Sequence, residues 1–154
     1  MNDFISACEV MREQLGHDVT ISLATSINDK VSVRIVDGYY QDGCIYIVTY
    51  LASQKMQEVT VNSNVAICKD LFSAQGIGTN MGHPKNEDNL ELSKKLREVF
   101  ISFYDRHVNE DDPQTCILKI VLTNAVAFTK DTKYIVDFTS RTATKYPFVN
   151  DIII

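Results

Sequence analysis

The feature that most constrains the fold is a succession of short segments in which apolar and polar residues alternate. Residues 19–24 and 31–35 alternate in this way on either side of the turn residues Asn28 and Asp29, which predicts a β-hairpin. Later segments with strand character are 44–50, "NSNVAICKDLF", "SAQGIGTN" (weakened by its glycines), "TCILKIVLTNAVAFTK" and "KYIVDFT". Because these strands follow one another without alternating helical crossovers, the sequence favours an antiparallel sheet or barrel over a doubly wound parallel sheet.

Helices are predicted at three places. Phe4, Cys8, Met11 and Leu15 form one stripe of an amphipathic helix. A short helix is expected at about 53–61, and the segment from 86 to 108 has the spacing of a long helix with one apolar face. With about six or seven strands, the fold class predicted is α+β, a small antiparallel barrel with flanking helices, in a single domain spanning 1–154.

The charge balance limits the partners that the chain can recognise. Lys and Arg total 15 against 20 Asp and Glu, so the net charge is −5. This argues against a general nucleic-acid binder or a binder of anionic membranes, and any cationic site must be local. The polar start lacks the apolar core of a secretion signal and no segment approaches the ~20 apolar residues of a membrane span, so we expect a cytoplasmic protein.

Cysteines and histidines point to no metal site. Two neighbouring cysteines in a C-x-x-C arrangement are absent, which predicts free thiols, mostly buried as small hydrophobic groups. The histidines are scattered over three predicted segments, so we expect no metal centre. The residues concerned are Cys8, Cys44, Cys68, Cys116, His17, His83 and His107.

The segment "TYLASQK", 49–55, is the first candidate for chemistry. Ser53 is a preferred N-cap residue, and the first turn of the helix that it begins presents unpaired N–H groups suited to an anion. Lys55 adds a positive charge near the positive end of the helix dipole, where it disfavours the helix, and we interpret it as a residue that serves a ligand. An ordinary capped helix with a solvated lysine is the alternative.

Arg34 is the second candidate. It lies within the strand "VSVRIVD", on the face opposite Val31, Val33 and Ile35. An arginine there can be a charge on a solvated face, but its fork can also bind two phosphate oxygens at once. If its strand pairs with the strand that ends at Thr49, Arg34 and Lys55 could meet around one phosphate. Because such contacts alone fall short of a micromolar complex, the ligand should also carry a large organic body.

Residues 21–68 resemble the FMN-binding split-barrel family related to pyridoxamine 5′-phosphate oxidase. The resemblance consists of five short motifs in order: Leu23-Ala24-Thr25, Arg34 with Val36, Thr49, Ser53 with Lys55, and Asn62 to Val65. It implies a split β-barrel. Beyond residue 80 it is limited to the order of elements, a helix and then further strands.

The resemblance also implies a cofactor site. Arg34, Ser53 and Lys55 would hold the phosphate of FMN, with Gln54 beside them. The segment Arg34, Ile35, Val36 and Asp37, and the strand end at Val48 and Thr49, would run along the flavin. In family members FMN lies between the two subunits of a homodimer, so a partner chain would complete the pocket.

The chain departs from the oxidase that names the family. That oxidase has a second basic residue where this chain has Gln54, and its basic C-terminal motif is missing from "KYPFVNDIII". We therefore do not predict pyridoxamine phosphate oxidation. Ile152 to Ile154 are expected to pack on the barrel or on the other subunit.

Two hypotheses of function follow. The first is an FMN-dependent oxidoreductase that passes hydride or electrons between a reductant such as NAD(P)H and a small substrate. No residue stands out as a general acid or base, which leaves open whether the chain is an enzyme. The second is a non-catalytic protein that stores or senses flavin, deazaflavin or haem.

Overall fold

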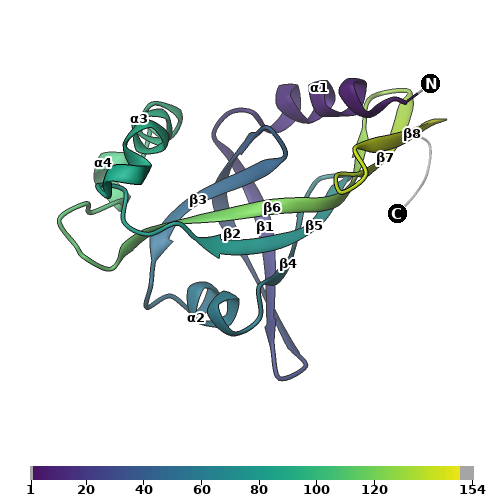
Figure 1. Cartoon of the computed structure of the whole chain (residues 1–154). Coiled ribbons are helices and arrows are strands. Elements are labelled where there is room, and N and C mark those ends of the chain that lie inside the picture. Colours follow the sequence, from purple (N-terminus) through teal and green to yellow (C-terminus); the bar gives the residue numbers. More distant parts are fainter. Residues whose placement is uncertain (1, 150–154) are drawn as a thin grey trace.

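A computed structural model describes residues 2–149, which form one antiparallel sheet and its flanking helices (Figure 1). The strands are β1 (Val19–Ile27), β2 (Lys30–Gln41), β3 (Cys44–Tyr50), β4 (Asn64–Lys69), β5 (Phe72–Asn80), β6 (Thr115–Phe128), β7 (Thr132–Asp137) and β8 (Thr142–Pro147). They lie in the order β3-β2-β1-β4-β5-β6-β7-β8, and β3 also pairs with β6. This additional pairing closes β1 to β6 into a six-stranded barrel that β7 and β8 extend. The predicted α+β barrel is confirmed.

The barrel wall is split because β3 changes partners. It pairs with β2 only opposite the segment Tyr39–Gln41, whereas its whole length pairs with β6. Residues 30–38 of β2 therefore have β1 on one side and, within the described sheet, no strand on the other. Figure 1 shows this part of the β1–β2 hairpin extending past the barrel beside α2. We call the opening between residues 30–38 of β2 and the end of β3 the split.

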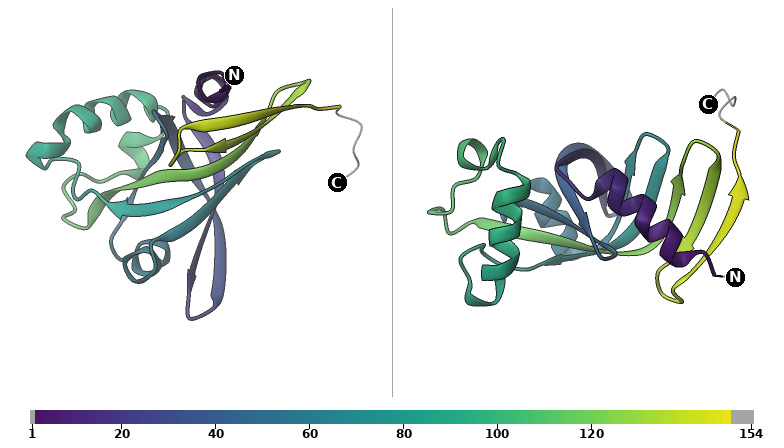
Figure 2. Two further views of the ribbon diagram at one scale, coloured as in Figure 1. Left: turned by 45° about the vertical axis from the view of Figure 1, so that its right-hand side comes forward. Right: turned by 90° about the horizontal axis from the view of Figure 1, so that it is seen from above.

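The helices lie at different ends of the barrel. They are α1 (Phe4–Leu15), α2 (Gln54–Val61), the 3-10 turn η1 (Glu87–Asn89), α3 (Leu90–Val99) and α4 (Tyr104–His107). The predicted apolar stripe of α1 faces the barrel core, and α1 and α2 lie on opposite sides of the barrel (Figures 1 and 2). A second apolar cluster, which includes Leu96, Phe100 and Ile117, joins α3 and α4 to the outer side of the sheet. None of the helices in residues 2–149 is long and apolar enough to cross a membrane.

The structure differs from the predicted elements at two places. The helix expected from 86 to 108 is divided into η1, α3 and α4, with a break between Val99 and Tyr104. Phe100 and Tyr104 are both buried across the break, so the apolar spacing continues although the helix stops. The eighth strand, β8, was not predicted because its mostly exposed residues leave no apolar alternation to detect.

The alternation in β2 was recognised, but the structure places its apolar residues outside. Val31, Val33 and Ile35 are 73%, 68% and 67% exposed, whereas Arg34 lies on the opposite, partly buried face. The four cysteines are free thiols as predicted. The expectation that most are buried is wrong, since only Cys116 is buried and Cys68 is exposed.

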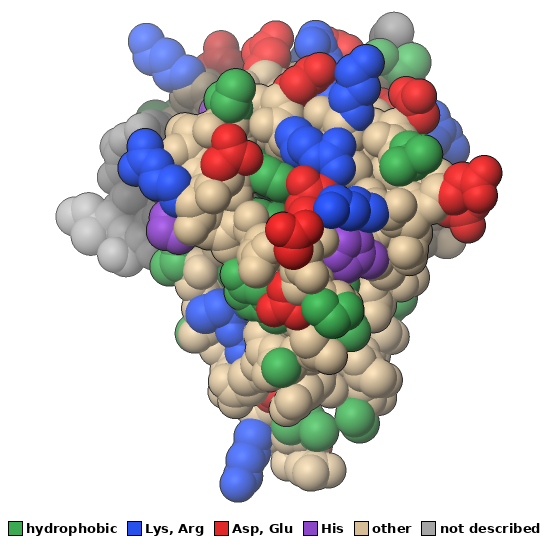
Figure 3. Space-filling view, turned by 90° about the vertical axis from the view of Figure 1, so that its left-hand side faces the viewer, with side chains coloured by type: hydrophobic (Ala, Val, Ile, Leu, Met, Phe, Trp, Pro, Cys, Tyr) green, Lys and Arg blue, Asp and Glu red, His purple; other side chains and the backbone are tan. Residues whose placement is uncertain are grey.

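Charge is mixed on the face that carries α3 and α4. Figure 3 shows acidic and basic side chains interspersed there, without a field of one sign. Residues 152–154, expected to pack on the barrel or a partner, lie outside the described residues.

Candidate functional site

Arg34 is held by three contacts on the inner face of β2. Its Nη1 donates to Thr25 Oγ1 at 2.7 Å and to the carbonyl oxygen of Leu23 at 3.2 Å, both on β1. Its Nη2 lies 3.5 Å from Glu58 Oε2 on α2. Because an arginine carries five N–H groups and these contacts use three, two donors remain for a ligand.

Glu58 completes a network across three elements. Its side chain is only 6% exposed, and its Oε2 also accepts from Thr25 Oγ1 at 3.1 Å. A buried carboxylate of this kind is costly unless it is paired, and Arg34 supplies the opposite charge. The network ties α2 to the hairpin on the open side of the split.

Helix α2 begins at the split because of its cap and its packing. Ser53 has extended backbone angles, and its Oγ accepts from Met56 N–H at 3.4 Å and donates to the carbonyl oxygen of Tyr50 at 2.7 Å. Met56 and Val59 are buried beneath the helix. A Cβ at Gly78 of β5 would lie 2.8 Å from Val59 Cγ1, so only glycine lets the helix approach this strand as closely.

The N-terminus of α2 faces the split with two kinds of donor. The N–H groups of Gln54 and Lys55 lie in the first turn, where a helix offers them no acceptor. The side chain of Gln54 reaches β2, with its Nε2 3.5 Å from Ser32 Oγ. The Ser53 hydroxyl, by contrast, already donates its proton to Tyr50, so a ligand oxygen would have to displace that bond.

Lys55 lies close to Arg34 without a carboxylate of its own. It is half-buried and forms none of the ion pairs within residues 2–149. Burial lowers the pKa of its ammonium, and the positive charge of Arg34 lowers it further. An anion bound beside both cations would reduce this repulsion and favour the protonated form of Lys55.

Cys116 and Thr49 mark the other wall of the split. Cys116 on β6 is opposite Thr49 on β3 in the sheet register. Burial raises the pKa of the Cys116 thiol to about 11, although the nearby charge of Lys55 acts in the other direction. Thr49 is buried on the same face of β3 as Ile45 and Ile47. The pKa of Lys55 responds to groups on both walls, since Arg34 on β2 lowers it and Cys116 on β6 raises it.

The remaining predicted residues do not converge through their side chains. Ile35 points outward, whereas Val36 packs against the barrel core. Val48 contacts the cluster under α3 and α4. Asp37 is half-buried, and burial followed by repulsion from Asp18 raises its pKa. These four residues can therefore share a site with Arg34 mainly through their backbone.

Two members of the Arg34 network were missed from the sequence. Thr25 was recognised only as part of the Leu23-Ala24-Thr25 motif. Glu58 lies three residues after Lys55, a spacing typical of an ion pair within one helix. The sequence therefore suggests Lys55 as its partner, whereas in the structure Glu58 pairs with Arg34. The signal in the sequence that could have indicated a buried carboxylate is the position of Glu58 between the apolar residues Met56 and Val59.

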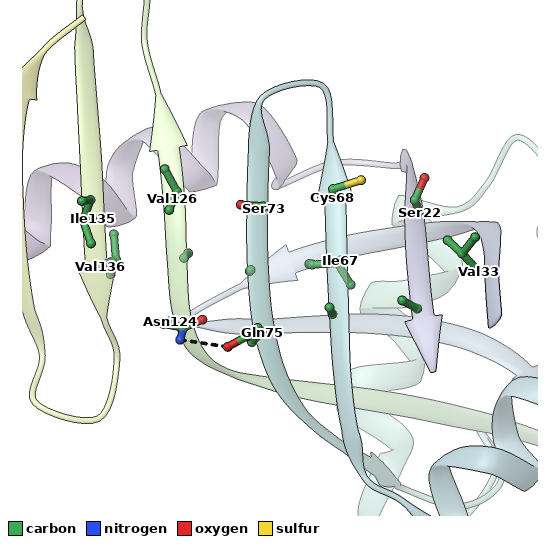
Figure 4. A pocket seen from close by; sticks show the side chains of 14 residues that line it. Ser22, Val33, Ile67, Cys68, Ser73, Gln75, Asn124, Val126, Ile135 and Val136 are labelled. Carbon is green, nitrogen blue, oxygen red and sulfur yellow. Dashed lines mark hydrogen bonds between the residues drawn. The ribbon is translucent and has the colours of Figure 1, made fainter. Parts of the chain in front are cut away.

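A hollow of about 540 Å³ lies elsewhere, on the outer face of the sheet. Figure 4 shows it lined by residues of β1, β4, β5, β6 and β7, with Val33 at its edge. Its polar groups include Asn124, whose Nδ2 donates to Gln75 Oε1 at 3.1 Å. Within residues 2–149 no three His, Cys, Asp or Glu side chains are grouped so as to hold a metal ion.

Comparison of the sequence with family models and with curated proteins gives no match. Solved structures do match. General stress protein 26 from Bacillus anthracis str. Sterne has 19% identity and a TM-score of 0.58, covering 81% of this chain and 92% of that chain. A candidate pyridoxamine 5′-phosphate oxidase from Listeria innocua has 15% identity and a TM-score of 0.58, covering 79% and 94%.

A third similar structure is described as that of a flavin-binding protein. It is an FAD-binding protein from Mesorhizobium loti, with 11% identity and a TM-score of 0.59, covering 79% of this chain and 90% of that chain. At these identities the similarity concerns the fold. The chain is therefore a split-barrel protein with the fold of proteins related to pyridoxamine 5′-phosphate oxidase, as its sequence motifs predict.

Proposed function

We propose that this chain is a flavoprotein that binds FMN at the split, with the phosphate between Arg34 and Lys55. The observation that carries the proposal is that α2 and β2 are joined by the contacts of Arg34 with Glu58 and of Gln54 with Ser32, each at 3.5 Å, which places Arg34 beside the helix start. Lys55 in that first turn is partly buried and has no carboxylate partner among the described residues. A phosphate group would relieve the repulsion between Arg34 and Lys55.

The donors at the split fit a phosphate monoester. Such a group carries about two negative charges and three acceptor oxygens. Lys55 offers its ammonium, Arg34 its two remaining N–H groups, and α2 the N–H groups of its first turn. Ser53 contributes as the cap that fixes this turn, and its direct contact with the phosphate requires the bond to Tyr50 to be exchanged.

The open side of β2 fits the polar edge of the flavin ring. An unpaired strand edge presents a row of N–H and C=O groups, and residues 30–38 have such an edge facing the split. The backbone of Ile35, Val36 and Asp37 would then contact the ring, together with the strand end at Val48 and Thr49. This use of the backbone explains why the side chains of these residues can point in different directions.

A second copy of the chain is proposed to cover the ring. Val31, Val33 and Ile35 form an exposed apolar row beside the split, and the hollow bordered by Val33 continues it across the outer face (Figure 4). Contiguous apolar surface of this kind is typical of an interaction site. A homodimer would bury the row and enclose a cofactor that one subunit leaves open.

The proposed activity is the transfer of hydride or electrons between a reductant such as NAD(P)H and a small substrate. When bound, the flavin supplies this redox chemistry. The residues of the chain bind its phosphate, orient its ring along β2 and exclude water by burial. The FAD-binding protein and the candidate oxidase among the similar structures support a flavin ligand.

A titration of the purified protein with FMN and with riboflavin tests the proposal. The two flavins differ only in the phosphate, so we expect FMN to bind at least about tenfold more tightly, measured by quenching of flavin fluorescence. Equal affinities would contradict the phosphate site, and binding of haem or a deazaflavin in preference to FMN would contradict the cofactor. Turnover with reduced nicotinamide then separates an oxidoreductase from a flavin store or sensor.

The variant that removes Arg34 needs a second substitution. Arg34→Ala alone would leave the buried Glu58 carboxylate without its partner, which typically costs about 3 to 5 kcal/mol of stability. Arg34→Ala combined with Glu58→Gln avoids this. We expect the double variant to fold and to show a smaller preference for FMN over riboflavin, because the guanidinium donors are lost while Lys55 and the first turn of α2 remain.

A further inference from the structure

A negative charge lies within the proposed phosphate site. Glu58 is buried beside Arg34, and its carboxylate lies where the guanidinium could otherwise contact an anion. Arg34, Lys55 and Glu58 together sum to a single positive charge, although two cations are present. A phosphate dianion entering the site therefore meets one carboxylate as well as two cations.

Arg34 does not depend on Glu58 for its position. The two shorter contacts of its guanidinium, at 2.7 and 3.2 Å, are to the neutral acceptors Thr25 Oγ1 and Leu23 O, while the contact with Glu58 is 3.5 Å. Thr25 also donates to Glu58 at 3.1 Å, so the carboxylate is held by the same hydroxyl that fixes the arginine. The main contribution of Glu58 is thus its charge.

We infer that Glu58 is a specificity-determining residue that weakens the binding of a dianionic phosphate and keeps FMN exchangeable with solution. This inference rests on the proposed function. A carboxylate in contact with an arginine that would bind the phosphate, in a partly buried place, would oppose binding of a dianion because repulsion there is screened less than at the surface. Gln54 in the first turn of α2 is neutral, so it adds no positive charge to offset that of Glu58.

Glu58→Gln tests the inference because glutamine has nearly the same shape, keeps an acceptor oxygen for Thr25 and removes the charge. We expect the dissociation constant of FMN to fall at least about tenfold, the dissociation rate of FMN to fall with it, and the affinity for riboflavin to stay unchanged. Glu91→Gln is the matched control. It makes the same chemical change at an exposed position of α3 and should alter neither affinity.

Gln54→Lys is a second test that leaves the buried network intact. Gln54 is exposed at the start of α2, so a lysine there adds a positive charge without an unpaired buried group. It should also tighten FMN selectively, because the added charge offsets that of Glu58. If Glu58→Gln does not fold, Glu58→Met takes its place, since it removes the carboxylate without adding a buried donor, and it carries the same expectation.

The outcomes separate this inference from the proposed function. If the wild-type protein prefers FMN to riboflavin but neither variant increases that preference, the inference is wrong and the phosphate site stands. If Glu58→Gln weakens FMN binding, Glu58 acts by positioning Arg34 and the inference is likewise wrong. If no form of the protein prefers FMN, both the inference and the proposed function fail.

Discussion

Replacing Lys55 by methionine should weaken FMN binding and at the same time stabilise the protein without ligand. Methionine keeps most of the apolar stem and removes the ammonium. A charge-assisted hydrogen bond contributes about 1.5 to 3 kcal/mol, so the dissociation constant of FMN should rise about 10- to 150-fold. Riboflavin has no phosphate and should bind as before.

The expected gain in stability follows from the lowered pKa of Lys55. Burial and the charge of Arg34 lower this pKa below its ordinary value of 10.5, so the protonated lysine destabilises the folded state. The penalty is fully present at neutral pH and disappears as pH rises through the ordinary pKa. Because the side chain is only partly buried and solvent screens the charge, the gain should be about 1 kcal/mol or less, or up to roughly 2 to 4 °C in Tm.

Two measurements check this pair of effects. Thermal unfolding by circular dichroism, at pH 7 and again near pH 10, gives the gain in Tm and its loss with rising pH. Fluorescence titration gives the affinities for both flavins. Lys94→Met, on the exposed face of α3, is the matched control and should change neither quantity. A Lys55→Met protein that melts at a lower temperature and binds FMN normally would show that Lys55 has a structural role.

Three further results are expected. Asp37→Asn should raise Tm at pH 7, because burial and the charge of Asp18 raise the pKa of Asp37 and so penalise its charged form. The gain in Tm should vanish below about pH 4, where the carboxyl is protonated in the folded and the unfolded state. A gain that persists at pH 3 would exclude this cause. Cys68 should be the thiol that reacts fastest with a disulfide reagent at pH 8, since it is exposed whereas Cys116 is buried. Because Cys68 lines the hollow that a second copy is proposed to cover, its reaction rate should fall at protein concentrations that favour a dimer. An unchanged fast phase in Cys68→Ser would contradict this assignment. Gly78→Ala should cost about 1 to 3 kcal/mol of unfolding free energy and weaken FMN more than riboflavin, because α2 must move away from β5; equal effects on both flavins would argue against α2 as the phosphate helix.

The positions of the strands along the chain and the position of α2 were predictable because both depend on local patterns. Alternating residues and turn signals identify β1 to β7, and Ser53 identifies the start of α2. The motifs between residues 21 and 68 were enough to predict a split barrel. Which face of β2 is buried was not predictable, because Val31, Val33 and Ile35 look like core residues until the split is seen.

The ion pair of the candidate site could not be predicted from the sequence, for a different reason. The contact between Arg34 and Glu58 joins residues 24 positions apart, and nothing in the local spacing of either residue indicates it. The pairing of β3 with β6, which brings Cys116 near Lys55, likewise depends on closure of the barrel. Local sequence patterns therefore identified the two cations but missed the carboxylate that offsets them.

A crystal structure of the protein with FMN bound tests the central claim most directly. We predict that the phosphate oxygens lie within hydrogen-bonding distance, about 2.7 to 3.2 Å, of both the Arg34 guanidinium and Lys55 Nζ, with the flavin ring along the open edge of β2. A phosphate bound anywhere else, or held by only one of the two cations while the other remains in solvent, would contradict the account.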